Sequence, residues 1–358
     1  MSLIPNFIAN FEDGCVKVET INFKYSAMER AKRIPWIDWA KVLGIMIVVF
    51  CHVPQYDTLV KHFLAQVQMP LFFMLSGYLH KPQSSLRDAL PRYWKSLVVP
   101  YLLFQLLFYP YWLFKEVVVP GAPFGVWHSL VMPFLGCLVG NVLDGPTWFL
   151  PALLVLKVLA DVSLSSRRPR LLMPAWGLFF VVTSFYIWRD DVVNISFTWD
   201  SLTNYAPFFL LGIYLRKERE SLWAGKLLLP VGALFTCLLY FLLTLLCVLA
   251  DVECYGLERL RFYLTGVFGA FFVLQFCKML PDTPSFVTDL SKGTIIILGF
   301  HWMCIGSINF VLGKYLLYDN SILYSTPQAL LLVLFITLVN YFAILFCQKH
   351  FSILLGGR

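Results

Sequence analysis

Apolar runs long enough to cross a lipid bilayer dominate this sequence. A transmembrane helix needs about 20 predominantly apolar residues to span the hydrocarbon core. Hydrophobic residues make up 59% of the 358 residues and charged residues only 14%, whereas soluble domains carry about 25% charged residues. Ten candidate spans lie at about 35–53, 60–80, 95–114, 146–161, 171–189, 199–215, 225–250, 260–280, 291–313 and 325–347. The pattern predicts an all-α, polytopic transmembrane helical bundle of about ten helices, and Pro70 should kink the second span.

Three segments fit this pattern less well than the others. The run at 146–161 is short, and the run at 199–215 is interrupted by two polar residues and Pro207. A further apolar stretch at 126–140 contains one proline and two glycines. We interpret it as a loop or re-entrant segment, which protein must cover because lipid cannot satisfy its backbone polar groups.

The placement of lysine and arginine predicts how the bundle is oriented. With the N-terminus in the cytoplasm, most of the 28 basic residues fall in cytoplasmic segments, as the positive-inside rule requires. A full crossing at 126–140 would place the later basic clusters outside. We therefore expect both termini in the cytoplasm and a multi-pass protein of the plasma or inner membrane. The expected organisation is a cytoplasmic N-terminal tail at 1–33, a membrane domain at 34–348 and a short cytoplasmic C-terminal tail at 349–358.

The first span contains three polar residues that share one face. On an α-helix, Lys41 and His52 lie within about 20° of the same line, and Asp38 lies about 40° from it. An ionisable group in hydrocarbon costs several kcal/mol and normally faces a cavity or the bundle interior. The shared face therefore predicts that Asp38, Lys41 and His52 border one cavity.

These residues admit structural and functional interpretations. Asp38 and Lys41 are compatible with an ion pair near the inner interface, and His52 with an interfacial histidine. In the functional interpretation, neutral His52 accepts a proton as a general base, and Lys41 supplies a fixed positive charge for an anionic cofactor. A proton relay in a transporter uses the same residue types.

Six segments, in order and spacing, resemble the acyltransferase-3 family of membrane acetyltransferases, particularly its fucose 4-O-acetylase-like branch. The first is the helix with Asp38, Lys41 and His52. The others are QMPLFFMLSGY at 68–78, WKSLVVPY at 94–101, GPTWFLP at 145–151, APFFLLGIYLRK at 206–217 and GTIIILGFH at 293–301. Each segment alone is unspecific, but together they cover the chain from about residue 34 to the mid-340s.

The resemblance implies transfer of an acyl group, usually acetyl from acetyl-CoA, to a sugar hydroxyl of a surface or exported glycan. The family's Arg/Lys-x10-His motif falls on Lys41 and His52, which makes His52 the expected catalytic histidine. Lys41 keeps the charge of the arginine often found there but lacks its bidentate geometry. The family's late histidine corresponds to His301. We group Asp38 with Lys41 and His52 as catalytic candidates.

Further candidates for substrate or cofactor binding have alternative interpretations. Arg87, Arg92 and Lys95 suit the phosphates of CoA, although positive-inside topology also explains them. Ser76 lies beside Gly77, where a helix or a ligand can approach closely. Trp148 is either an interfacial anchor or a cavity wall. The remaining histidines belong to no motif, and we interpret them as interfacial or loop residues: His62, His80, His128 and His350.

The resulting hypothesis is direct acyl transfer, in which His52 deprotonates the acceptor hydroxyl. The alternative mechanism is a double displacement through an acyl-histidine intermediate. The expected partners are an acyl-CoA, a glycan or lipid-linked sugar acceptor and membrane lipids, with no nucleic acid. The nine cysteines form no CxxC pair and no zinc-type cluster, so no metal is expected. The alternative function is a secondary transporter or glycan flippase with an Asp/Lys/His path, which inverted repeats would favour; the sequence shows none.

Overall fold

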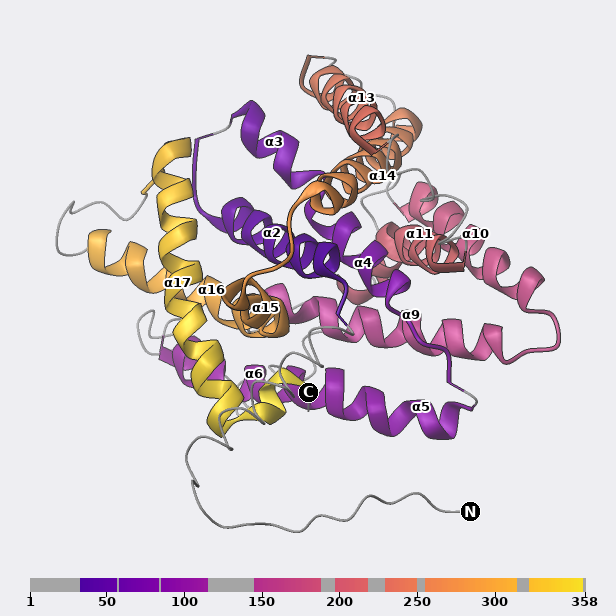
Figure 1. Ribbon diagram of the computed structural model, residues 1–358, viewed down its shortest axis with the longest axis horizontal. Helices are drawn as coiled ribbons and strands as arrows, with labels where there is room; N and C mark the ends of the chain where they lie inside the picture. The colour runs from indigo at the N-terminus through magenta and orange to yellow at the C-terminus, as the bar shows by residue number, and fades with distance from the viewer. Residues whose placement is uncertain are drawn as a thin grey trace, which may run out of the picture. The chain divides into compact units, whose positions relative to one another are not determined.

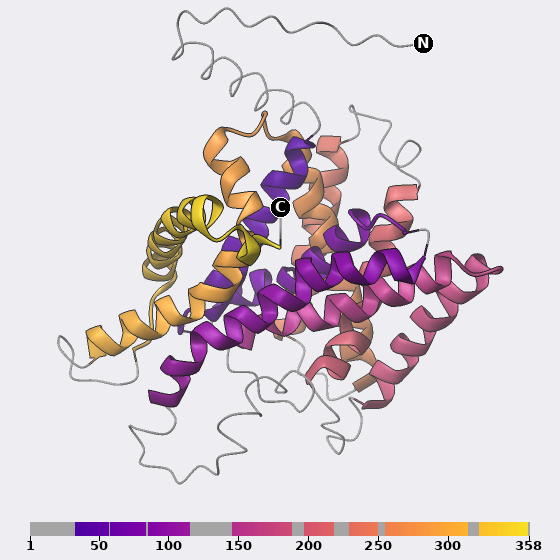
Figure 2. The same cartoon turned by 90° about the horizontal axis from the view of Figure 1, so that it is seen from below.

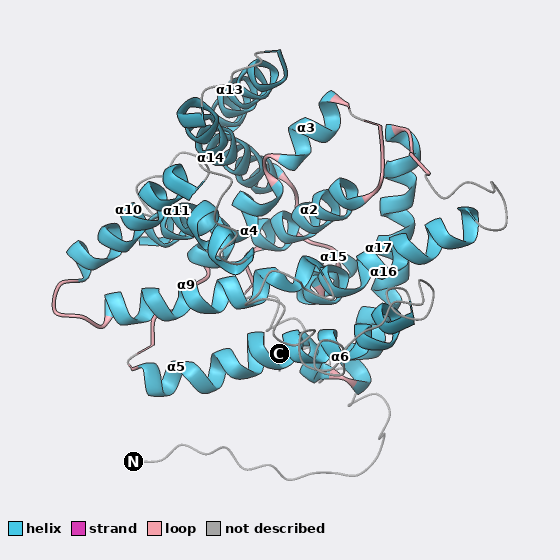
Figure 3. Cartoon of the chain, turned by 180° about the vertical axis from the view of Figure 1, so that it is seen from behind, coloured by secondary structure: helices cyan, strands magenta, loops and turns pink. Residues whose placement is uncertain are grey.

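The fold is built from helices. The computed structural model describes residues 33–56, 58–83, 85–114, 145–187, 197–217, 229–249, 255–313 and 322–356. In these ranges the only β-type pairing is one isolated bridge between Gln55 and Tyr324, and Figure 3 shows helices joined by loops. The predicted all-α class is therefore confirmed. All of the predicted N-terminal tail except Arg33, and the whole segment at 126–140, lie outside the described residues.

The first half of the described chain contains α2 (Pro35–His52), α3 (Leu59–Ala65), α4 (Gln68–Tyr78), α5 (Leu86–Tyr93), η1 (Trp94–Val98), α6 (Val99–Leu113), η3 (Gly145–Trp148), α9 (Phe149–Leu164) and α10 (Pro169–Ile187). The second half contains α11 (Phe197–Lys217), α13 (Leu229–Leu249), α14 (Tyr255–Met279), α15 (Ser285–Lys292), α16 (Thr294–Val311), α17 (Thr326–His350) and η6 (Ser352–Leu355).

Six helical segments of the described chain are long and apolar enough to cross a membrane: Pro35–His52, Leu86–Leu113, Gly145–Leu164, Leu257–Met279, Thr294–Val311 and Thr326–His350. Two shorter apolar helices cover Pro169–Phe185 and Pro230–Leu246. Large apolar side chains remain outside, with Val231 and Leu331 65% and 67% exposed. Such a surface suits lipid rather than water. The protein is thus a multi-pass membrane protein, while ten spans and cytoplasmic termini stay predictions.

The second predicted span is divided into two helices. α3 begins after Thr58, whose Oγ1 accepts a hydrogen bond from the backbone N–H of Lys61 at 3.3 Å. Residues 66–67 form a turn, and α4 begins at Gln68. Pro70 is the third residue of α4, where its missing N–H removes no helical hydrogen bond. This proline therefore lies at a helix start instead of kinking a continuous span.

The third predicted span contains a π-helical turn. α5, η1 and α6 follow one another without a break, and η1 is a π-helix of five residues. Such insertions widen a helix locally and are frequent at functional sites. Here the wider turn contains Ser96 and Leu97, and both side chains line the cavity described below.

Helix α2 lies inside the bundle in two perpendicular views (Figures 1 and 2). Half of its residues are buried, the largest share among the six candidate spans. Apolar residues of α2, including Ile45 and Val49, belong to one core with residues of α6, α15, α16 and α17. The helix that contains the predicted catalytic residues is therefore held from several sides, which fixes its side chains in place.

Two glycines allow close contact between α4 and α11. A methyl group at Gly77 would clash with the backbone carbonyl of Phe209, and one at Gly212 would clash with that of Met74. The two helices therefore approach backbone to backbone, as small residues permit in membrane bundles. The helix-packing interpretation of Gly77 is confirmed.

Candidate active site

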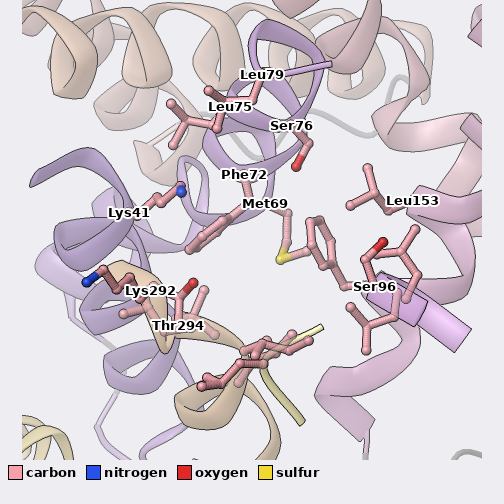
Figure 4. A pocket seen from close by; sticks show the side chains of 18 of the residues that line it. Lys41, Met69, Phe72, Leu75, Ser76, Leu79, Ser96, Leu153, Lys292 and Thr294 are labelled. Carbon is pink, nitrogen blue, oxygen red and sulfur yellow. The ribbon is translucent and has the colours of Figure 1, made fainter. Parts of the chain in front are cut away.

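A cavity of about 180 Å³ lies between α2, α4, η1, α9, α15 and α16. Three lysines and three hydroxyl groups contribute to its wall: Lys41, Lys157, Lys292, Ser76, Ser96 and Thr294. The rest of the lining is apolar, and none of the described residues that line it is an aspartate or glutamate. Figure 4 shows Lys41 and Lys292 on one side of the cavity, with Ser76 and Ser96 on the other. The cavity suits a ligand with anionic and apolar parts.

The three polar residues of α2 have different surroundings. Lys41 lines the cavity together with Ile45 and Val48 of the same helix. Asp38 is 3% exposed and accepts a 2.5 Å hydrogen bond at Oδ1 from the hydroxyl of Ser291, at the end of α15. Of the three side chains predicted to border one cavity, only Lys41 lines this one. Asp38 instead ties α2 to α15.

His52 and His301 form a pair near one end of α2 and inside α16. Their ring centroids are 5.0 Å apart, and the rings meet edge to face at 70°. His52 Nδ1 lies 2.7 Å from the carbonyl oxygen of Val48, and His301 Nδ1 lies 2.8 Å from that of Ile297. Because a carbonyl oxygen only accepts, each Nδ1 carries a hydrogen, and each neutral ring keeps its lone pair on Nε2. His52 thus presents the nitrogen that a general base requires.

The cavity wall includes residues one helical turn away from each histidine of the pair. Val48 lines the cavity, and its carbonyl oxygen accepts the hydrogen bond from Nδ1 of His52. Leu298, one turn before His301 on α16, lines it as well. His301 is fully buried, and no described group hydrogen-bonds its Nε2. A ligand in the cavity would therefore end about one helical turn from both imidazoles.

Two cavity residues were absent from the predicted site. Lys157 is an ionisable residue inside an apolar run, and that signal alone makes it a functional candidate. Lys292 follows a polar stretch, and the sequence assigns it only to the basic residues of the cytoplasmic segments. Only the fold shows that both residues line the cavity with Lys41.

Several predicted binding residues lie elsewhere. Arg87, Arg92 and Lys95 are exposed on α5 and η1 and do not line the cavity, whereas Ser76 does. Trp148 packs among aromatic rings, parallel to those of Phe73 and Tyr205 within 25°. The indole thus packs against α4 and α11, and it is not among the residues that line this cavity.

A buried polar cluster lies next to the cavity, around Asp161 on α9. Its Oδ2 accepts a 2.5 Å hydrogen bond from the hydroxyl of Tyr93, and its Oδ1 lies 2.9 Å from Nε2 of His80. Arg216 donates to the carbonyl of His80. His80 follows the end of α4 and is only 2% exposed, so it is a buried loop residue and not an interfacial one.

The donor set favours an organic ligand over a metal ion at the cavity. Three ammonium groups repel cations, and among the residues that the structure describes no group of three His, Cys, Asp or Glu side chains could hold a metal. The three lysines are the groups that could hold an anionic co-substrate.

The fold and the site together define a multi-pass membrane protein with a paired histidine beside a lysine-lined cavity. The model of the acyltransferase-3 family, described as an acyltransferase domain, matches residues 34–346. The chain belongs to this family and is a membrane acyltransferase, which transfers groups other than aminoacyl groups. No curated protein and no solved structure matches the chain.

Proposed function

We propose that the protein transfers an acetyl group from acetyl-CoA to a hydroxyl of a cell-surface or exported glycan, with His52 as the general base. The observation that supports this best is the geometry of His52. The Val48 carbonyl holds its Nδ1–H, its Nε2 keeps the lone pair, and its ring lies one turn from the lysine-lined cavity. Family membership supports acyl transfer over transport.

The reaction follows from this geometry. The Nε2 of His52 takes the proton of the acceptor hydroxyl as the oxygen attacks the thioester carbonyl. The new C–O bond forms, the C–S bond breaks, and the proton on His52 passes to the departing thiolate of CoA. The ring remains fixed throughout, because the Val48 carbonyl orients it.

The two substrates reach His52 from opposite sides in this proposal. With the N-terminus in the cytoplasm, Lys41 lies in the inner half of α2 and His52 at its outer end. The donor then occupies the cavity from the cytoplasmic side, where CoA is made. The acceptor approaches His52 from the outer half of the bundle, which suits an exported or lipid-linked sugar.

Glycan acetylation in cells tests the proposal. Mass spectrometry of surface glycans should show acetyl groups in cells with the gene and none in cells without it. His52→Ala should lower acetylation by about 100-fold or more, because a general base contributes about that factor. His350→Ala is the matched control, since this histidine is exposed at the end of α17. Wild-type acetylation by His52→Ala would contradict the assignment.

A further inference from the structure

We propose that Lys157 and Lys292, together with Lys41, form an anion site that binds the phosphates of the acyl donor. The inference rests on the proposed function, because it concerns the same cavity, and it adds which side chains recognise the donor. Its support comes from charge, from the contacts that place the lysines, and from the distance to His52.

The cavity has a strong excess of positive charge. Its three lysines come from α2, α9 and the end of α15, and no carboxylate among the described residues lines it. Lys292 has an acidic neighbour in Asp289, 3.7 Å away, but both side chains are partly exposed, so this pair is weak. Three ammonium groups around one cavity repel one another, and an anionic ligand between them offsets this repulsion.

Separate contacts hold two of these lysines at the cavity. Ser291, the neighbour of Lys292, donates to the buried carboxylate of Asp38 and thereby fixes the end of α15 against α2. The Nζ of Lys157 lies 5.8 Å from the centre of the Tyr93 ring, and the Tyr93 hydroxyl donates a hydrogen bond to Asp161. These contacts fix the end of α15 that contains Lys292 and place Lys157 beside the Tyr93 ring.

The chemistry of the site matches phosphate groups on an extended molecule. Lysine binds phosphate as a compact charge, and several lysines together suit a diphosphate or a phosphomonoester better than a single carboxylate. Lys41 and His52 are separated by about 17 Å along α2, a length comparable to the extended pantetheine arm of CoA. The apolar wall between them includes Ile45, Val48 and Leu298. Phosphates at the lysines therefore leave the thioester near the histidine pair.

Ligand binding to the purified full-length protein tests this inference without any acceptor. Titration calorimetry in neutral-lipid nanodiscs compares CoA with pantetheine, which has the same thiol arm but no phosphate. Wild type should bind CoA about 100-fold more tightly than pantetheine. Lys157→Ala and Lys292→Ala should each weaken CoA binding about tenfold, the effect of one charge-assisted contact, and leave pantetheine binding unchanged.

Three controls keep the result interpretable. Lys157→Arg and Lys292→Arg keep the charge and should retain most of the affinity for CoA. Lys349→Ala removes an exposed lysine at the end of α17 and should bind CoA as wild type does. If an alanine variant fails to fold, the salt dependence of binding to the wild-type protein still tests the anion site. Its affinity for CoA should fall with added salt, whereas its affinity for pantetheine should not.

Equal binding of CoA and pantetheine by wild type, or unchanged CoA binding in both alanine variants, would overturn the inference. His52→Ala should bind CoA normally, because the lysines remain. A protein that binds CoA through the lysines but transfers no acyl group would contradict the proposed function alone. A protein that transfers acetyl groups but ignores the CoA phosphates would contradict the anion site alone.

Discussion

At the level of single residues, the proposed reaction depends on which histidine nitrogen is free to take a proton. His52 and His301 both use Nδ1 to donate to a carbonyl one turn earlier. When His52 takes a proton, it becomes positively charged within the membrane domain. Neighbouring His301 has a lone pair on Nε2, and its ring centroid lies 5.0 Å from that of His52, close enough to stabilise this charge. His301 is therefore expected to act as a positioning residue for His52.

His301→Phe tests this role because it keeps a ring of similar size and removes the lone pair. We expect kcat to fall about tenfold, which corresponds to the loss of one hydrogen bond to a charged group. The KM for acetyl-CoA should change little, because the cavity lysines are untouched. Kinetics in washed membranes with radiolabelled acetyl-CoA measure both constants. A His301→Phe enzyme with wild-type kcat, or with a defect in KM alone, would rule the role out.

At the level of elements, buried polar contacts join the helices beside the cavity. Tyr93 on α5 donates to Asp161 on α9, and His80 after α4 lies against the same carboxylate. Leu355 from η6 also lines the cavity. Gly356 follows with a φ of 76°, and a side chain there would press on the backbone of Ser96. The elements around the cavity are thus joined by specific contacts as well as by apolar packing.

Tyr93→Phe should destabilise this arrangement, because it leaves a buried carboxylate without one of its donors. The expected loss of stability is about 1–3 kcal/mol, seen as a lower melting temperature of the purified protein in detergent. Tyr56→Phe is a matched control, since this tyrosine is 57% exposed. Equal melting temperatures for the two variants would mean that the Tyr93 hydroxyl contributes nothing to the packing of α5 on α9.

At the level of the whole molecule, the sequence predicts the class of fold because apolar runs report directly on a lipid environment. The helical class follows from these runs, whereas the family resemblance follows from the six ordered segments. His52 and His301 are 249 residues apart in the sequence and still lie as a pair. Helix ends were harder to predict. Pro70 reads as a kink within an apolar run, and only tertiary packing shows that it begins α4.

The residues of the site were only partly predictable, because tertiary packing decides which side chains line the cavity. A helical repeat places Asp38, Lys41 and His52 on one face of α2, but neighbouring helices decide what each one meets. Asp38 accepts a hydrogen bond from Ser291 of α15, whereas Lys41 lines the cavity. Lys157 and Lys292 lie far from Lys41 in the sequence, so no local pattern could group the three lysines. Long-range packing supplied that information.

We propose His52 as the general base of acetyl transfer, because its Nδ1 is held by the Val48 carbonyl and its Nε2 keeps the lone pair. The most direct test is the rate at which washed membranes move radiolabelled acetyl from acetyl-CoA into their own glycan and glycolipid fraction. If His52 is the base, His52→Ala lowers kcat at least about 100-fold and leaves the KM for acetyl-CoA nearly unchanged. Transfer by His52→Ala at the wild-type rate would contradict it.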